Sequence, residues 1–220
     1  MSEMSSLGSA ETAPGDSYSF EVEATALLLA LEHHDAATRN HSDSVASWSR
    51  RIAEVLGLPL SARCFIERCA LLHDIGKIFT PKEFLTNPGP LTVDEWVRMK
   101  AHAAEGAAML AAVPRLADYA DVVRAHHEHY DGRGYPHGLR GDAIRCEARI
   151  ISVADAFDAM ISRRDYRKSL SVNAAITEVQ RCRGSQFEPA VADALVSLLL
   201  PEGARLRRSS ADTHLHSRYA

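Results

Sequence analysis

Apolar residues recur along the chain at intervals of three and four, which places them on one face of an α-helix. The spacing predicts a first helix with apolar positions from Val22 onward, a second from Val45 to Leu56, and a third that starts near Ser61 and stops at Gly76. Further helices are predicted around 116–129, 147–162, 172–183 and 189–200. No alternation of apolar and polar residues is long enough to predict a strand.

A connector rich in proline and glycine, TPKEFLTNPGPLT at 80–92, separates the third helix from the next and is predicted to be a loop. Thr92 and Glu95 have the spacing of a capping box, so we expect them to open the helix that bears His102. A second loop, rich in glycine, is predicted over 131–141. Both loops lie next to the candidate chemistry.

Composition favours one all-α domain. The 220 residues are enough for a single domain with a sizeable core, and the abundance of alanine and leucine over aromatic residues favours packed helices. The polar segments at the two ends of the chain show no helical spacing of apolar residues. We therefore expect a flexible N-terminal segment over 1–19, one helical bundle domain over 20–200, and a mobile C-terminal tail over 201–220.

Charge and cysteine content limit the classes of binding partner and the cellular compartment that the sequence is compatible with. A net charge of −4 does not support binding of polymeric nucleic acid through a basic surface. The four cysteines lack the paired spacing of a zinc knuckle or a redox motif, so we expect reduced, packed thiols. The longest apolar run, Ala24 to Leu31, is too short to cross a bilayer. We expect a cytoplasmic protein without membrane contact.

Ionisable residues stand where the pattern predicts buried positions. Asp155 lies inside the apolar run IISVADAF, and His73 and Asp74 follow an apolar stretch at a predicted helix end. A buried carboxylate costs several kcal/mol unless it is paired or coordinated. Taken singly, a helix cap explains His73 and Asp74, and an arginine partner explains Asp155.

A shared metal centre explains these residues together. Histidines and aspartates recur near the inner faces of four or five successive helices, with His41, His102 and the segment HHEHYDGRGYP at 126–136 among them. Imidazole and carboxylate ligands without cysteine suit iron, manganese, nickel or zinc. The candidate ligands are too many for one tetrahedral ion. Two ions about 3.5 to 4 Å apart can polarise a phosphodiester and hold a bridging hydroxide for attack, which favours phosphoester hydrolysis.

The motifs resemble a known family. HDIGK at 73–77, His102, HHEHYDGRGYP at 126–136 and VADAFDAM at 153–160 are similar to those of the HD-GYP subgroup of the HD metal-dependent phosphohydrolase superfamily, over roughly residues 28–200. The resemblance implies a single HD-type helical bundle with a metal site in its core. It also implies hydrolysis of cyclic di-GMP to linear pGpG, and in some members onward to GMP, with a diguanylate cyclase as a candidate partner.

The resemblance also implies a ligand set for two divalent ions, with iron or manganese expected first and nickel or zinc as alternatives. The first ion would be held by His41, His73, Asp74 and Asp155. Asp74 would bridge to a second ion held by His102, His126 and His127. Adjacent helical residues point about 100° apart, so His127 has the alternative role of orienting a ligand from outside the coordination shell. Ala37 stands where some members carry a Glu for a third ion, so we expect two.

Catalytic and substrate-binding roles follow from the same resemblance. Asp74 and Lys77 would be catalytic, with Lys77 also neutralising phosphate charge. The other implied substrate-binding residues are Tyr135, Arg164, Arg167 and Lys168. The implied loop-supporting residues are Asp131, Gly132, Gly134 and Pro136. The alternatives are a solvated surface position for Lys77 and an ordinary charged turn for Lys168.

Two departures from the family pattern keep other functions open. Ser44 replaces a frequent Arg, and Asp165 replaces a frequent Pro. One alternative is a catalytically weak module that binds nucleotide or a diguanylate cyclase. Another is a hydrolase of the linear dinucleotide.

Overall fold

The computed structural model describes residues 14–87, 89–162 and 169–199. The helices in chain order are α1 (Pro14–His34), α2 (Ala36–Val55), α3 (Leu60–Leu72), η1 (Ile75–Phe79), α4 (Lys82–Thr86), α5 (Val93–Ala111), η2 (Ala117–Tyr119), α6 (Ala120–Ala125), η3 (Gly141–Ala143), α7 (Cys146–Ile161), α8 (Val172–Arg181) and α9 (Pro189–Leu199). No strand forms within these ranges, so the predicted all-α class is confirmed.

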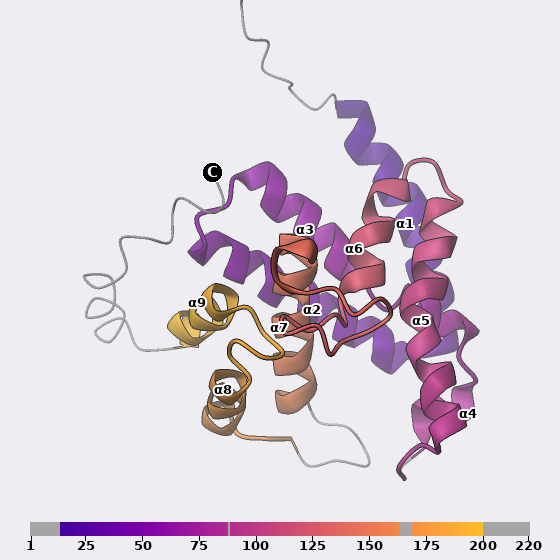
Figure 1. Cartoon of the computed structure of the whole chain (residues 1–220). Coiled ribbons are helices and arrows are strands. Elements are labelled where there is room, and N and C mark those ends of the chain that lie inside the picture. Colours follow the sequence, from indigo (N-terminus) through magenta and orange to yellow (C-terminus); the bar gives the residue numbers. More distant parts are fainter. Residues whose placement is uncertain (1–13, 88, 163–168, 200–220) are drawn as a thin grey trace, which may run out of the picture.

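Helix α7 lies at the middle of the bundle (Figure 1). It packs against α2, α3, α6, α8 and α9. Helix α5 packs against α6 and η1. The apolar core between these helices includes the fully buried side chains of Ile52, Leu72, Ile151 and Phe157. Burying such side chains supplies most of the driving force for assembly.

Two helix ends have the local geometry that their sequence predicts. The Thr92 side chain accepts a hydrogen bond from the Glu95 backbone N–H, and the Glu95 carboxylate accepts one from the Thr92 N–H at 2.7 Å, so the capping box is confirmed. Helix α2 ends just before Gly57, whose φ of 75° favours glycine. Among the described helices, none is long and apolar enough to span a bilayer.

Three predicted boundaries differ from the structure. Helix α1 already includes Pro14, the first described residue, because proline is tolerated in a first helical turn and the apolar pattern gives no signal for the polar residues after it. Helix α3 ends at Leu72, and the chain continues as the 3₁₀ turn η1 rather than stopping at Gly76. The connector predicted to be a loop contains α4, which Pro81 precedes with a fixed φ of −54°.

The helix predicted around 116–129 is also shorter than expected. It is divided into η2 and α6, and α6 ends at Ala125. The N–H of Glu128 donates to the Ala125 carbonyl, closing a turn that contains His126 and His127. The division of the chain at residues 19 and 200 remains a prediction, since residues 1–13 and 200–220 lie outside the described part.

Candidate metal centre

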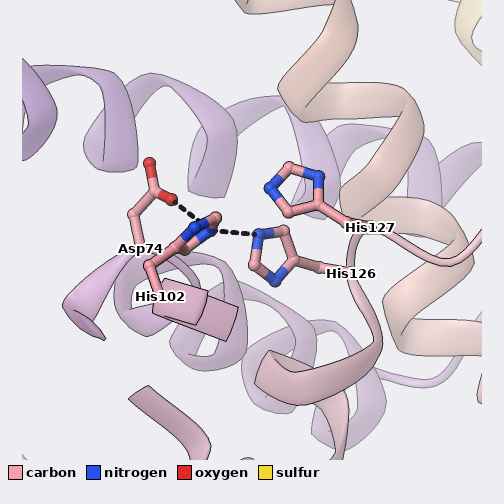
Figure 2. Close-up of side chains that lie close together, drawn as sticks. All are labelled: Asp74, His102, His126 and His127. Carbon is pink, nitrogen blue, oxygen red and sulfur yellow. Dashed lines mark hydrogen bonds and ion pairs between the residues drawn. The ribbon is translucent and has the colours of Figure 1, made fainter. Parts of the chain in front are cut away.

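Four predicted ligands converge in one buried cluster. Asp74 comes from the α3–η1 junction, His102 from α5, and His126 and His127 from the turn after α6 (Figure 2). Each offers a ligand atom, and these atoms lie within 4.8 Å of one another. The Nε2 atom of His102 is 3.3 Å from Oδ1 of Asp74 and 3.4 Å from Nε2 of His126. This arrangement concentrates donor atoms that can hold a cation.

A second group adjoins the first. His41 from α2, His73 from the end of α3 and Asp155 from α7 also offer ligand atoms within 4.8 Å of one another. The Oδ2 atom of Asp74 lies 3.4 Å from Nε2 of His73. The structure therefore brings together all seven residues predicted from the sequence, with Asp74 between the two groups.

Three histidines are held in the tautomer that a metal site requires. The Nδ1 atoms of His73, His102 and His126 contact backbone carbonyl oxygens three residues earlier, at 2.7, 2.6 and 2.6 Å. A carbonyl can only accept, so each Nδ1 carries a proton, and in the neutral imidazole the lone pair is then on Nε2. Nε2 of His73 is fully buried and has no hydrogen-bond partner among the described residues. A divalent cation fits this unsatisfied atom and the donors around it.

His41 is oriented by a carboxylate that the sequence analysis missed. Oδ2 of Asp158 lies 2.7 Å from Nδ1 of His41, while Nε2 of His41 lies 2.9 Å from Asp155. The Ser162 hydroxyl also donates to Asp158, at 3.0 Å. A buried carboxylate behind a histidine ligand fixes its ring and raises its basicity. The available signal was spacing, because Asp158 lies three residues after Asp155 on the same helical face.

Electrostatics keep the carboxylates ionised. Burial favours protonation of Asp74, but the charge of Lys77 and the contact with the His73 ring outweigh it and hold the pKa of Asp74 well below its usual range. Nζ of Lys77 lies 2.5 Å from Oδ2 of Asp74. Burial likewise opposes ionisation of Asp155, yet its hydrogen bond with His41 lowers the pKa of Asp155 strongly. Asp74 and Asp155 are therefore both ionised where they face the centre.

Most of the histidines are neutral in the absence of metal. Burial, followed by the interaction with the neighbouring His127 imidazole, lowers the pKa of His126 well below its usual value, and burial lowers the pKa of His127 to about 3. Burial also lowers the pKa of His102. His41 differs, because hydrogen bonds with two carboxylates overcome the effect of burial and raise its pKa to about 9. Neutral imidazoles are the form that binds metal.

Glycines allow two close backbone approaches. A Cβ on Gly76 would lie 2.0 Å from the carbonyl oxygen of His102 and 2.5 Å from the N atom of Gly106, so η1 can pack against α5 only with glycine there. A Cβ on Gly134 would lie 2.5 Å from the His127 carbonyl oxygen. The N–H of Tyr135 donates to that carbonyl at 3.2 Å. The first approach holds η1, which follows Asp74, against the helix that bears His102. The second holds the 131–141 loop against the turn that contains His127.

The 131–141 loop folds back over the centre. Its Gly132 has a φ of 84°, and Tyr135 and Pro136 are joined by a cis peptide bond. The Tyr135 ring lies 4.8 Å from the His127 ring. Burial and then the charges of Asp74 and Asp155 raise the pKa of Tyr135. The neutral phenol thus lies beside the candidate ligands.

Two carboxylates support this loop. Buried Glu128 accepts hydrogen bonds from the backbone N–H groups of His137 and Leu139, at 2.7 and 3.0 Å. The Asp131 side chain accepts one from the N–H of Arg133 at 3.1 Å. The remaining predicted substrate-binding residues, Arg164, Arg167 and Lys168, lie outside the described residues.

The chain is similar to known proteins. A family model described as HD domain matches residues 25–191. Over 172 residues the chain is 40% identical to a cyclic di-GMP phosphodiesterase response regulator of Xanthomonas campestris pv. campestris, covering 77% of this chain and 46% of that protein. Over 174 residues it is 38% identical to a cyclic di-GMP phosphodiesterase of Thermotoga maritima, covering 78% of this chain and 47% of that protein.

A solved structure shares the fold. Bd1817, an HDG"Y"P protein from Bdellovibrio bacteriovorus, matches with a TM-score of 0.63 at 18% identity, covering 84% of this chain and 63% of that one. The chain spans about half the length of the two curated relatives, 46% and 47%.

Proposed function

The chain belongs to the HD domain family, whose members bind divalent metal ions, and from this premise we propose that it is a cyclic di-GMP phosphodiesterase of the HD-GYP type. The expected product is the linear dinucleotide pGpG, and further cleavage to GMP is part of the proposal. One observation carries it: two groups of histidine and aspartate adjoin beside the GYP loop, with Asp74 of one group 3.4 Å from His73 of the other. The two curated relatives named above are called cyclic di-GMP phosphodiesterases.

We propose two divalent ions per chain, iron or manganese first and nickel or zinc as alternatives. His41, His73, Asp74 and Asp155 would hold one ion, and Asp74, His102, His126 and His127 the other. Bound divalent ions supply Lewis acidity, which polarises a phosphodiester and lowers the pKa of water. The donor set supports this choice, because it combines imidazole nitrogens and carboxylates without a thiolate.

The chain's own residues bind and orient the substrate. Lys77 points its ammonium at Asp74, so a phosphate bound at the centre would lie beside a compact cation able to neutralise charge on its oxygens. Tyr135 presents a neutral hydroxyl and a ring face next to His127. Arg164, Arg167 and Lys168 remain proposed contacts to phosphate or guanine.

An Asp74→Ala variant tests this proposal against a non-hydrolytic module. An enzyme should lose bound metal and at least about 100-fold in kcat/KM, since even the outer partners of metal ligands cost 10- to 100-fold. The matched control is Asp142→Ala, which removes an aspartate with a 75% exposed side chain. Metal content and cyclic di-GMP turnover are measured on the same samples.

The alternative hypothesis is a binding module, with a diguanylate cyclase as its protein partner. Such a module would keep its partner in co-purification when Asp74 is replaced. If Asp74→Ala hydrolyses cyclic di-GMP as fast as the parent, the proposed centre is wrong.

A further inference from the structure

A row of aromatic and cationic groups leads away from the metal centre. It starts at the His127 ring, which lies 4.8 Å from the Tyr135 ring. Nζ of Lys100 lies 5.2 Å from the centroid of the Tyr135 ring. The same ammonium lies 5.5 Å from the centroid of the Trp96 ring. Lys100 therefore connects the candidate active-site loop to an aromatic side chain at the surface of α5.

Neither residue is explained by the packing of the fold. The Trp96 side chain is 49% exposed, although a large ring is usually buried. No carboxylate of the described part of the chain forms an ion pair with Lys100, which is half-buried. Because the two are four residues apart on α5, an ordinary surface pair would explain their mutual contact. It would not explain the contact between Lys100 and Tyr135, which comes from a distant loop.

The row matches the chemistry of a cyclic dinucleotide. Such a molecule carries two phosphodiesters and two purine bases on one ring. When one phosphodiester lies at the metal centre, the other and its base extend away from it. An ammonium without a carboxylate partner can neutralise that second phosphate, and an exposed indole face can stack a base. Lys100 and Trp96 present these two groups in that order from the centre.

We infer that Lys100 and Trp96 form a subsite for the nucleotide half that is not cleaved, with Lys100 binding its phosphate and Trp96 stacking its purine. This inference rests on the proposed cyclic-dinucleotide hydrolysis. The subsite would contribute to affinity and to the choice of substrate without touching the reacting phosphate. Loss of the subsite would therefore raise KM more than it lowers kcat.

Steady-state kinetics on two substrates test the subsite. Trp96→Ala and Lys100→Met should each raise KM for cyclic di-GMP about tenfold, the loss expected for one stacked base or one charge-assisted contact. Both should keep the parental kcat on bis(p-nitrophenyl) phosphate, which has no base and only one phosphate. The controls are Val97→Ala, 65% exposed beside Trp96, and Lys82→Met on exposed α4. Parental KM in both test variants would overturn the subsite.

Tryptophan fluorescence provides a readout that does not require turnover. The chain has two tryptophans, and the half-buried Trp48 packs edge-on against Phe157, at 5.0 Å between centroids. Cyclic di-GMP added to the metal-loaded protein should quench emission in the parent, and Trp96→Phe should abolish that change. Quenching without hydrolysis would support the subsite and refute the phosphodiesterase proposal. Hydrolysis with no quenching, and with parental KM in Trp96→Ala, would refute the subsite alone.

Discussion

The imidazoles of the centre are oriented from their outer side. Three of them donate Nδ1–H to a backbone carbonyl on their own helix or turn, and His41 instead contacts the carboxylate of Asp158. A carbonyl fixes the tautomer, whereas a carboxylate fixes it and adds negative charge behind the ring. Burial opposes protonation of His41, but hydrogen bonds with Asp155 and then Asp158 outweigh it and raise the pKa of His41 to about 9 in the metal-free protein. Asp158 matters to the centre although it is not a predicted ligand.

Replacing Asp158 should therefore weaken metal binding. Asp158→Ala leaves Nδ1 of His41 buried without its acceptor, and we expect a 10- to 100-fold loss of metal affinity, the usual cost of removing such a partner. Titration of the chelator-treated protein with Mn(II) measures this loss of metal affinity. The control is Ser162→Ala, which removes a hydroxyl from Asp158 but leaves the pair with His41. Parental affinity in Asp158→Ala would show that His41 needs no fixed orientation.

At the scale of elements, the centre depends on how closely η1 approaches α5. The contact between Gly76 and the backbone at His102 and Gly106 places Asp74 against the helix that supplies His102. Backbone atoms line this contact, so a side chain cannot be accommodated by rotation of a neighbour. Helix packing and ligand geometry are therefore set by the same glycine.

A methyl group at this position should displace the two elements. Gly76→Ala should destabilise the fold by about 1–3 kcal/mol, as overpacking does, and lower bound metal because Asp74 and His102 separate. Thermal unfolding and metal analysis measure both effects. Gly89→Ala is the matched control, since a Cβ there meets only the Asn87 side chain, at 3.4 Å. A Gly76→Ala protein with parental melting temperature and metal content would contradict this role of the η1–α5 contact.

At the scale of the whole molecule, periodicity predicted the all-α class and most of the longer helices, and the resemblance to the HD-GYP subgroup implied the seven residues that converge. Periodicity could not predict the turn at His126 and His127, because the apolar spacing of α6 continues past the point where a backbone hydrogen bond ends the helix. Asp158 and Lys100 were missed for another reason. Spacing placed Asp158 on the same helical face as Asp155, but the roles of Asp158 and Lys100 depend on partners 117 and 35 residues away, which the packed fold brings near.

The central claim is that this fold assembles two metal ions into a phosphodiesterase centre. The most direct test incubates protein purified without chelator with cyclic di-GMP and Mn(II) or anaerobic Fe(II), then identifies products and metal content on the same sample. We predict the linear dinucleotide or GMP, with about two metal ions per chain. A full complement of metal with no hydrolysis of cyclic di-GMP would contradict the claim.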